Sequence, residues 1–158
     1  AIRAGRSAGI PIVADSRYSL LDYEGATAAT PNESEVLEAL GYKAWKEASL
    51  EQVAGELLRR TGIEGIIITR GSLGMYTVGA GGTSRSIGVV GSNEATDVTG
   101  AGDTVSAVTA LSLAAGATLF EAAEIATYAA SVVVMKRGTA SVSPQELHER
   151  FDLYPPNA

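Results

Sequence analysis

The sequence predicts an α/β domain with a mostly parallel sheet flanked by helices. Short β-branched runs alternate along the chain with segments whose apolar residues recur every three to four positions. Residues 66–69 are continuously β-branched, which is typical of a strand covered on both faces. Alternating strands and helices favour parallel pairing, because each helix carries the chain back to the start of the next strand. Since no internal repeat or linker appears, one domain over residues 1–158 is expected.

The part of the chain before residue 66 is expected to hold two strands followed by two helices. In order, these elements are residues 10–14, 25–30, 36–40 and 49–60. Gly41 and Gly62 stand just past the two helices, where a left-handed residue commonly ends a helix. Ser49 and Gln52 have the spacing of a capping box, which indicates where the second helix begins.

The part after residue 69 is expected to form a pair of antiparallel edge strands and then three helices. The strands are residues 75–78 and 86–90, and the first two helices are residues 104–115 and 119–136. Thr118 and Glu121 have capping-box spacing, and Gly138 follows the second of these helices. The last helix follows Ser143-Pro-Gln-Glu146, with Ser as the cap and Pro at the first helical position.

The composition excludes several classes of function. A net charge of -6 and a pI near 4.8 argue against a nucleic-acid-binding protein, which usually has a basic face. Without cysteine and with His148 as its single histidine, the chain cannot build a thiolate or histidine zinc site. His148 is expected to be a solvated surface residue. No apolar stretch has the length of a membrane span, so no membrane partner and a cytoplasmic location are expected.

The segment Asp97-Val-Thr-Gly-Ala-Gly-Asp103-Thr precedes a long alanine-rich apolar run. Gly100 and Gly102 permit a tight turn, and the following helix would direct its free N–H groups and its dipole toward an anion. A carboxylate such as Asp103 is unfavourable there unless it does chemistry, for example by accepting a proton from a hydroxyl that attacks a phosphate. The alternative is a plain helix start with Thr99 or Asp103 as its cap. Residue types alone leave both interpretations open.

Polar residues follow several of the strand candidates directly. Asp15, Asn32 and Arg70 each come just after a predicted strand, and the turn at Gly100 does the same. Ligands of open α/β sheets bind beyond the carboxyl ends of the strands. We therefore expect these four positions to lie along one rim of the molecule.

Three ordered motifs resemble those of the ribokinase-like, or PfkB, sugar kinases. The segment 97–104 is similar to the second signature of that family, Thr30-Pro-Asn-Glu-Ser-Glu35 to its Asn-x-x-Glu element, and Thr69-Arg-Gly71 to its nucleotide-side turn. The resemblance covers essentially the whole chain, which corresponds to the C-terminal half of such kinases. It implies a three-layer ribokinase-like fold.

Within this family, the chain looks most like the heptose-7-phosphate kinase branch. The similarity is carried by residues 23–32, 98–105, 113–117 and 136–144. Val108 departs from the broad family, which usually has glycine there, whereas the heptose branch tolerates other residues. The resemblance implies an ATP- and Mg2+-dependent kinase acting on a heptose 7-phosphate or a related sugar.

The resemblance also implies roles for the segment 97–104. Asp103 would be the base that accepts the proton of the sugar hydroxyl. The N–H groups of Gly100, Ala101 and Gly102 would form an anion hole for the transferring phosphoryl group. Some relatives bind a monovalent cation such as K+ beside this hole, which would involve Asp97, Thr99 and the backbone near Gly138.

Residues 32–35 would lie near the phosphates of ATP in such a kinase. This places Asn32, Glu33, Ser34 and Glu35 at the cofactor, with Glu35 acting on Mg2+ through water, because Mg2+ retains several waters. Asn-x-x-Glu is also the pattern of a capping box, with Asn32 as the cap, so a purely structural role is the alternative.

The turn after residue 69 would contact nucleotide phosphates or ribose through Thr69, Arg70, Gly71 and Gly74. A plain surface turn is the alternative. Arg17 would reach a phosphate as a basic residue does in relatives, or be an ordinary exposed arginine. Four apolar residues have helical spacing and are expected in the core or in the wall of an adenine pocket: Tyr128, Val133, Val134 and Met135.

The N-terminal half of PfkB kinases carries most of the sugar-contacting residues and a β-sheet lid, and this chain has no corresponding segment. Residues 1–158 are thus expected to be the ATP-binding and catalytic-base part of a sugar kinase. The alternative is a non-catalytic nucleotide-binding or assembly fragment that needs the missing half for sugar binding. The sheet edge left without its neighbours suggests pairing with a second copy as a homodimer.

Overall fold

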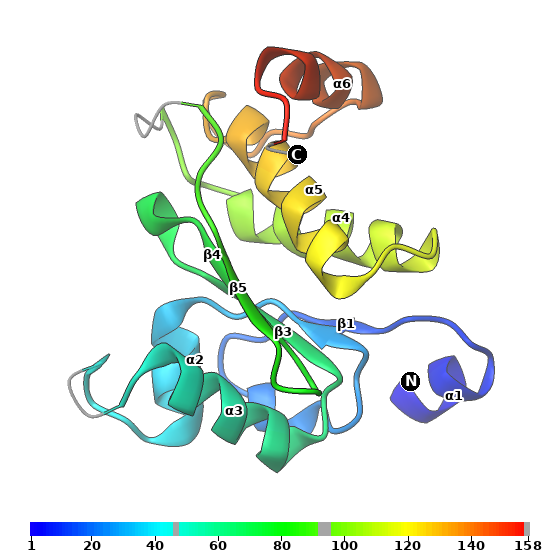
Figure 1. Cartoon of the computed structure of the whole chain (residues 1–158), viewed down its shortest axis with the longest axis vertical. Helices are drawn as coiled ribbons and strands as arrows, with labels where there is room; N and C mark the ends of the chain where they lie inside the picture. Colours follow the sequence, from blue (N-terminus) through cyan, green and yellow to red (C-terminus); the bar gives the residue numbers. More distant parts are fainter. Residues whose placement is uncertain (46–47, 92–95, 157–158) are drawn as a thin grey trace.

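The sheet lies in the middle of the molecule, between helices (Figure 1). Its strand order is β1-β2-β3-β4-β5. The computed structural model describes residues 1–45, 48–91 and 96–156. In this part of the chain the strands are β1 (Val13–Ala14), β2 (Ala28–Ala29), β3 (Gly65–Thr69), β4 (Met75–Gly79) and β5 (Ser84–Ile87). β2 pairs in parallel with β1 and β3, whereas β4 pairs antiparallel with β3 and β5.

The sheet is therefore mixed: β1, β2 and β3 are parallel as expected, and β4 and β5 are the antiparallel strands predicted at one edge. β1 and β2, which belong to the parallel part of the sheet, have only two residues each. Pro11 has no N–H, and the N–H of Ile12 donates to the Thr27 hydroxyl at 3.0 Å instead of to a strand. The longer strands β3, β4 and β5 follow one another through short turns, which link antiparallel neighbours.

Helices cover both faces of the sheet, so the predicted three-layer α/β architecture is confirmed (Figure 1). They are α1 (Ile2–Ser7), α2 (Glu33–Leu40), α3 (Leu50–Thr61), α4 (Ala101–Ala114), α5 (Leu119–Val133) and α6 (Pro144–Leu153). α2 and α3 lie on one face, α4 and α5 on the other, and α6 packs on α5.

β3 separates two hydrophobic clusters. Ile66 and Ile68 face α2 and α3, where they pack in one cluster with Val36 and Leu57. Ile67 faces the opposite side and packs with residues of α4 and α5. Because all three isoleucines are fully buried, the prediction of a strand covered on both faces is confirmed.

The predicted helix starts are confirmed by their hydrogen bonds. Capping boxes form in all four predicted pairs: Asn32 with Glu35, Ser49 with Gln52, Thr118 with Glu121, and Ser143 with Glu146. Gly41 and Gly62 end α2 and α3 in the left-handed conformation. Other helix boundaries differ: α2 begins at Glu33 rather than 36, α4 begins at Ala101 rather than 104, and α5 ends at Val133 rather than 136. Among the strands, β1 and β2 cover only residues 13–14 and 28–29 rather than 10–14 and 25–30, and β5 covers residues 84–87 rather than 86–90.

Candidate active site

Among the residues that the structure describes, no side chain caps the N-terminus of α4. It begins after Gly100, whose φ of 80° is in the left-handed region that favours glycine. The N–H of Ala101 donates to the carbonyl of Val98 at 3.2 Å. In the described part of the chain, no acceptor meets the N–H groups of Gly100, Gly102 and Asp103. Of the three predicted anion-hole donors, two are thus available to a ligand.

Asp103 lies in the first turn of α4, and its side chain is exposed. No described residue donates a hydrogen bond to its carboxylate. A negative charge in the first turn of a helix is stabilised by the helix dipole, so the expectation that a carboxylate is unfavourable here without a chemical role was wrong. The arrangement leaves both oxygens of Asp103 free to meet a hydroxyl of a bound molecule.

Asp97 fixes the turn that leads into α4. Its Oδ1 accepts from the N–H of Thr99 at 2.9 Å, and its Oδ2 accepts from the N–H of Gly138 at 2.9 Å. Hydrogen bonds from the Thr99 side chain, the Thr99 backbone and the Gly138 backbone lower the pKa of Asp97. The residues predicted for a monovalent cation site therefore do lie together.

The predicted phosphate-side residues of α2 are engaged in its cap. Oδ1 of Asn32 accepts from the N–H of Glu35 at 3.0 Å and from the Ser34 hydroxyl at 2.6 Å. Oε2 of Glu35 accepts from the N–H of Asn32 at 2.9 Å. The capping box that was the alternative interpretation of Asn32 and Glu35 is thus present in the fold. No described residue bonds to Oε1 of Glu35, which leaves this atom available for a water or an ion.

The turn between β3 and β4 lies beside this cap. Asn32 and Thr69 form a parallel bridge, and the N–H of Thr69 donates to Pro31 at 2.9 Å. Nε of Arg70 donates to Oε1 of Glu33 at 2.9 Å in a half-buried ion pair. The fold therefore brings two predicted cofactor motifs together through contacts between residues 37 apart in sequence. The ion pair was not predicted from the sequence.

Gly74 closes the same turn with a φ of 81°. A Cβ at this position would lie 2.0 Å from the carbonyl oxygen of Ile87 and 3.0 Å from the Gly88 backbone. Because both obstacles are backbone atoms, only glycine allows β5 to approach the turn so closely.

A pocket of about 310 Å³ lies between this turn and the start of α4. Its wall includes five residues predicted for nucleotide or phosphate binding: Thr69, Gly71, Gly74, Ala101 and Gly102. The remaining lining residues are Ser72, Met75, Val89, Val90, Val98, Val105, Thr127, Ala130, Ser131 and Val134. Of these ten residues, only Val134 was predicted from the sequence as a possible wall residue of an adenine pocket.

Ser106 joins α4 to the ends of β1 and β2. Its Oγ lies 2.7 Å from the Thr30 hydroxyl and donates to Oδ2 of Asp15 at 2.8 Å or to the carbonyl of Gly102 at 3.1 Å. Ser106 was not predicted as a site residue, although its position three residues after Asp103 places both on one side of the helix. These contacts bring Asp15 to the first turns of α4, as the expected rim requires.

Other candidates lie away from the pocket. Arg17 is exposed and lies 5.8 Å from the ring of Tyr18. His148 is exposed, as predicted, and its Nδ1 lies 2.8 Å from the Pro144 carbonyl. Tyr128 and Val133 are in the core as expected, but Met135 is 47% exposed, because the chain has left α5 before it.

Two further observations concern metal ions and membrane-spanning helices. Among the described residues, no cluster of three or more His, Cys, Asp or Glu side chains could hold a metal ion by itself. None of the helices within the same residues has the length and apolar character needed to cross a membrane.

An α/β fold with a pocket beside a glycine-rich helix start defines a class of phosphate-binding enzymes. Residues 1–146 match the pfkB family of carbohydrate kinases, and the chain belongs to this family.

The similar curated proteins include the bifunctional protein HldE of Citrifermentans bemidjiense, 42% identical over 146 residues, and that of Aeromonas hydrophila, 42% identical over 147 residues. Each alignment covers 92% of this chain and 30% of the relative. The chain thus spans about a third of the length of these proteins.

Solved structures show the same fold at low identity. Phosphofructokinase-2 from Escherichia coli in complex with potassium has a TM-score of 0.82 and 19% identity, over 96% of this chain and 50% of that one. Ribokinase from Thermotoga maritima has a TM-score of 0.79 and 22% identity, over 96% of this chain and 52% of that one. The predicted ribokinase-like fold is therefore confirmed.

Proposed function

We propose that this chain is the ATP-binding and catalytic-base part of a sugar kinase. The observation that carries the proposal is the pocket of about 310 Å³ that reaches the uncapped N-terminus of α4, beside Asp103. The pocket supplies an apolar surface for a base, and the helix start supplies free N–H groups for phosphates. Membership of the pfkB carbohydrate kinase family agrees with both.

The pocket suits a nucleotide in one orientation. Its apolar wall, which includes Val90, Ala130 and Val134, would take the adenine. The phosphates would then lie between the turn at Thr69 and the N–H groups of Gly100 and Gly102. Mg2+ would bind between the phosphates and water held by Glu35, an arrangement that needs few protein ligands.

Asp103 would act as the general base. Its carboxylate takes the proton of a sugar hydroxyl while the hydroxyl oxygen attacks the γ-phosphorus, and the bond to the β-phosphate oxygen of ADP breaks. Its exposure and free oxygens support this role. The free donors at the start of α4 would stabilise the charge on the transferring group.

A heptose 7-phosphate is the acceptor that we propose. The support is the 42% identity to bifunctional HldE proteins, together with the motif similarities of residues 23–32 and 136–144. A monovalent cation is proposed at Asp97 and Thr99, since a phosphofructokinase-2 of the same fold was solved with potassium. 

The second candidate is a nucleotide-binding half that requires a partner for sugar binding. It is favoured by one observation: the chain covers only about half of the kinases whose fold it shares. The partner would be a second copy, paired along the free edge of β1 as a homodimer. Light scattering showing a monomer at micromolar concentration would argue against that pairing.

Titration calorimetry with Mg-ATP and an ATP-consumption assay with heptose 7-phosphate, fructose and ribose test the two candidates. The kinase proposal expects nucleotide binding and consumption that depends on one sugar. Binding without consumption, also after addition of a complementary N-terminal half, would support the second candidate. Absence of nucleotide binding would exclude both.

A further inference from the structure

Arg150 of α6 reaches across to the wall of the nucleotide pocket. Its Nε donates to the Ser131 hydroxyl of α5 at 2.8 Å. Its Nη2 donates to the carbonyl of Val90 at 3.2 Å and to that of Ser131 at 3.4 Å. Val90 and Ser131 both line the pocket. One guanidinium therefore connects two segments of the same wall, residues 88–91 and α5.

The partners of Arg150 show what kind of contact this is. Among the described residues, no carboxylate forms an ion pair with it, and every acceptor is a carbonyl or a hydroxyl. Its guanidinium also lies 4.6 Å from the ring centroid of Tyr154. A planar group with several fixed donors can bond two segments at once, which a lysine ammonium on a flexible chain does poorly. The contact is thus suited to fixing geometry rather than to neutralising charge.

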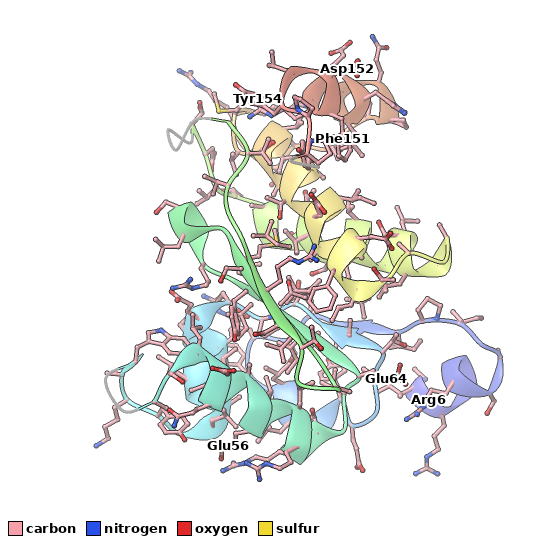
Figure 2. All side chains as sticks on the ribbon, viewed as in Figure 1. Arg6, Glu56, Glu64, Phe151, Asp152 and Tyr154 are labelled. Atoms are coloured by element: carbon pink, nitrogen blue, oxygen red, sulfur yellow. The ribbon has the colours of Figure 1, made fainter. Side chains whose placement is uncertain are left out.

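The packing around the guanidinium is tight on the side of residues 88–91. Gly91 has a φ of 81°, and a Cβ there would lie 2.6 Å from Nη2 of Arg150 and 3.2 Å from the ring of Tyr154. α6 itself is anchored on α5. The Tyr128 hydroxyl donates to the Tyr154 carbonyl at 2.6 Å, and the Tyr128 ring stacks on Phe151 at 4.0 Å. Figure 2 labels Phe151 and Tyr154 where α6 meets the end of α5.

We propose that Arg150 is a positioning residue for the nucleotide site. By linking residues 88–91 to α5 through hydrogen bonds, it keeps these two parts of the adenine wall at the separation that nucleotide binding requires. The inference rests on the proposed function, which places the adenine against Val90. Arg150 lies beyond residue 146, where the match to the pfkB family ends, so the fastening is a feature of this chain outside the matched region.

The test compares Arg150→Ala with the wild-type chain by calorimetric titration of AMP, Mg-ATP and inorganic tripolyphosphate. We expect the Kd of AMP and of Mg-ATP to rise by about tenfold, the loss expected for one charge-assisted hydrogen-bonded contact. The Kd of tripolyphosphate should stay the same, because its site at α4 does not include the adenine wall. Arg150→Lys should recover little of the loss. Arg3→Ala, at an exposed arginine of α1, is the control and should change nothing.

Gly91→Ala tests the same contact from the other side and should repeat the selective loss, even if Arg150→Ala folds poorly. Unchanged Kd values in both variants would overturn the inference, as would an equal loss for all three ligands, which would indicate a general structural role. If the wild-type chain binds none of the three, the proposed nucleotide site itself fails.

Discussion

α2 and α4 carry a carboxylate at the same helical position, three residues after the cap, yet the two are in opposite situations. Glu35 of α2 accepts the N–H of its own cap residue, while Asp103 of α4 accepts no hydrogen bond from any described residue. At α2 the side chains satisfy the backbone, and at α4 Gly100 leaves the donors free. The difference separates a helix start that stabilises the fold from one that is available to a ligand.

The largest difference in turnover is expected between variants that replace the two carboxylates one at a time. Asp103→Asn should lower turnover by about 10²–10⁴-fold, the usual contribution of a general base, and leave Mg-ATP binding and the free energy of unfolding nearly unchanged. Glu35→Gln retains a side chain that suits a capping box, so it should raise the Mg2+ requirement with a far smaller loss of turnover. ATP consumption at varied Mg2+ measures both. Equal losses of turnover in the two variants would contradict the different roles assigned to Asp103 and Glu35.

Gly100→Ala should be the next largest change. A residue other than glycine in the left-handed region costs about 1–2 kcal/mol, and relief of that strain would displace the free donors of α4. Gly41→Ala is the matched control, because Gly41 ends α2 at a φ of 77° with open space around it. Both variants should lose similar stability in chemical denaturation, but only Gly100→Ala should weaken binding of Mg-ATP. Unchanged binding of Mg-ATP by Gly100→Ala would show that the N-terminus of α4 is not part of the nucleotide site.

Asn32→Ala separates the capping role of Asn32 from its proposed nucleotide role. Loss of the cap should lower the free energy of unfolding by about 1 kcal/mol. Ser49→Ala removes the equivalent cap of α3 and should lower stability by a similar amount. Only Asn32→Ala should also raise the Kd of Mg-ATP, measured by calorimetry. If both variants bind Mg-ATP with the same Kd, Asn32 acts only as the cap of α2 and does not contact the nucleotide.

The smallest effect is expected at Glu146, a capping-box carboxylate that also pairs with Lys136 at 2.6 Å. The hydrogen bond from Lys136, followed by those from the Ser143 backbone and side chain, lowers the pKa of Glu146 to about 2. Since the folded-state pKa is depressed from 4.5, its contribution to stability is complete above pH 4.5 and is lost as the pH falls toward about 2. Denaturation curves of Glu146→Gln should therefore depend less on pH in this window. Glu38→Gln, at an exposed glutamate of α2, should retain the wild-type dependence.

Features that depend on a few neighbouring residues could be predicted from the sequence. The four capping boxes, the glycines that end α2 and α3, and the buried isoleucines of β3 all follow from local chemistry. The rim of polar residues was also predictable, because the carboxyl ends of the strands determine it. Asn32 indeed lies against Thr69, and Asp15 reaches the start of α4.

Features that depend on distant segments could not be predicted. The hydrogen bond from the Ile12 N–H to the Thr27 hydroxyl joins residues 15 apart in sequence, which no periodicity reveals. The ion pair of Glu33 with Arg70 and the contacts of Arg150 join residues from separate elements, each of which looks like an ordinary surface charge in the sequence. The pocket is made in the same way, since its walls come from β3, α4, α5 and residues 88–91.

The hydroxyl of Ser106 has a consequence for the order in which the molecule assembles. It bonds to Thr30, 76 residues earlier, and to Asp15, 91 residues earlier. At a synthesis rate of about 5–20 residues per second, Asp15 waits about 5–18 s before its partner is made. The turns joining β3, β4 and β5 close much sooner, since contacts between near neighbours in sequence form fastest. The rim that would meet the phosphates is thus completed late, after the antiparallel strands β3, β4 and β5 have formed.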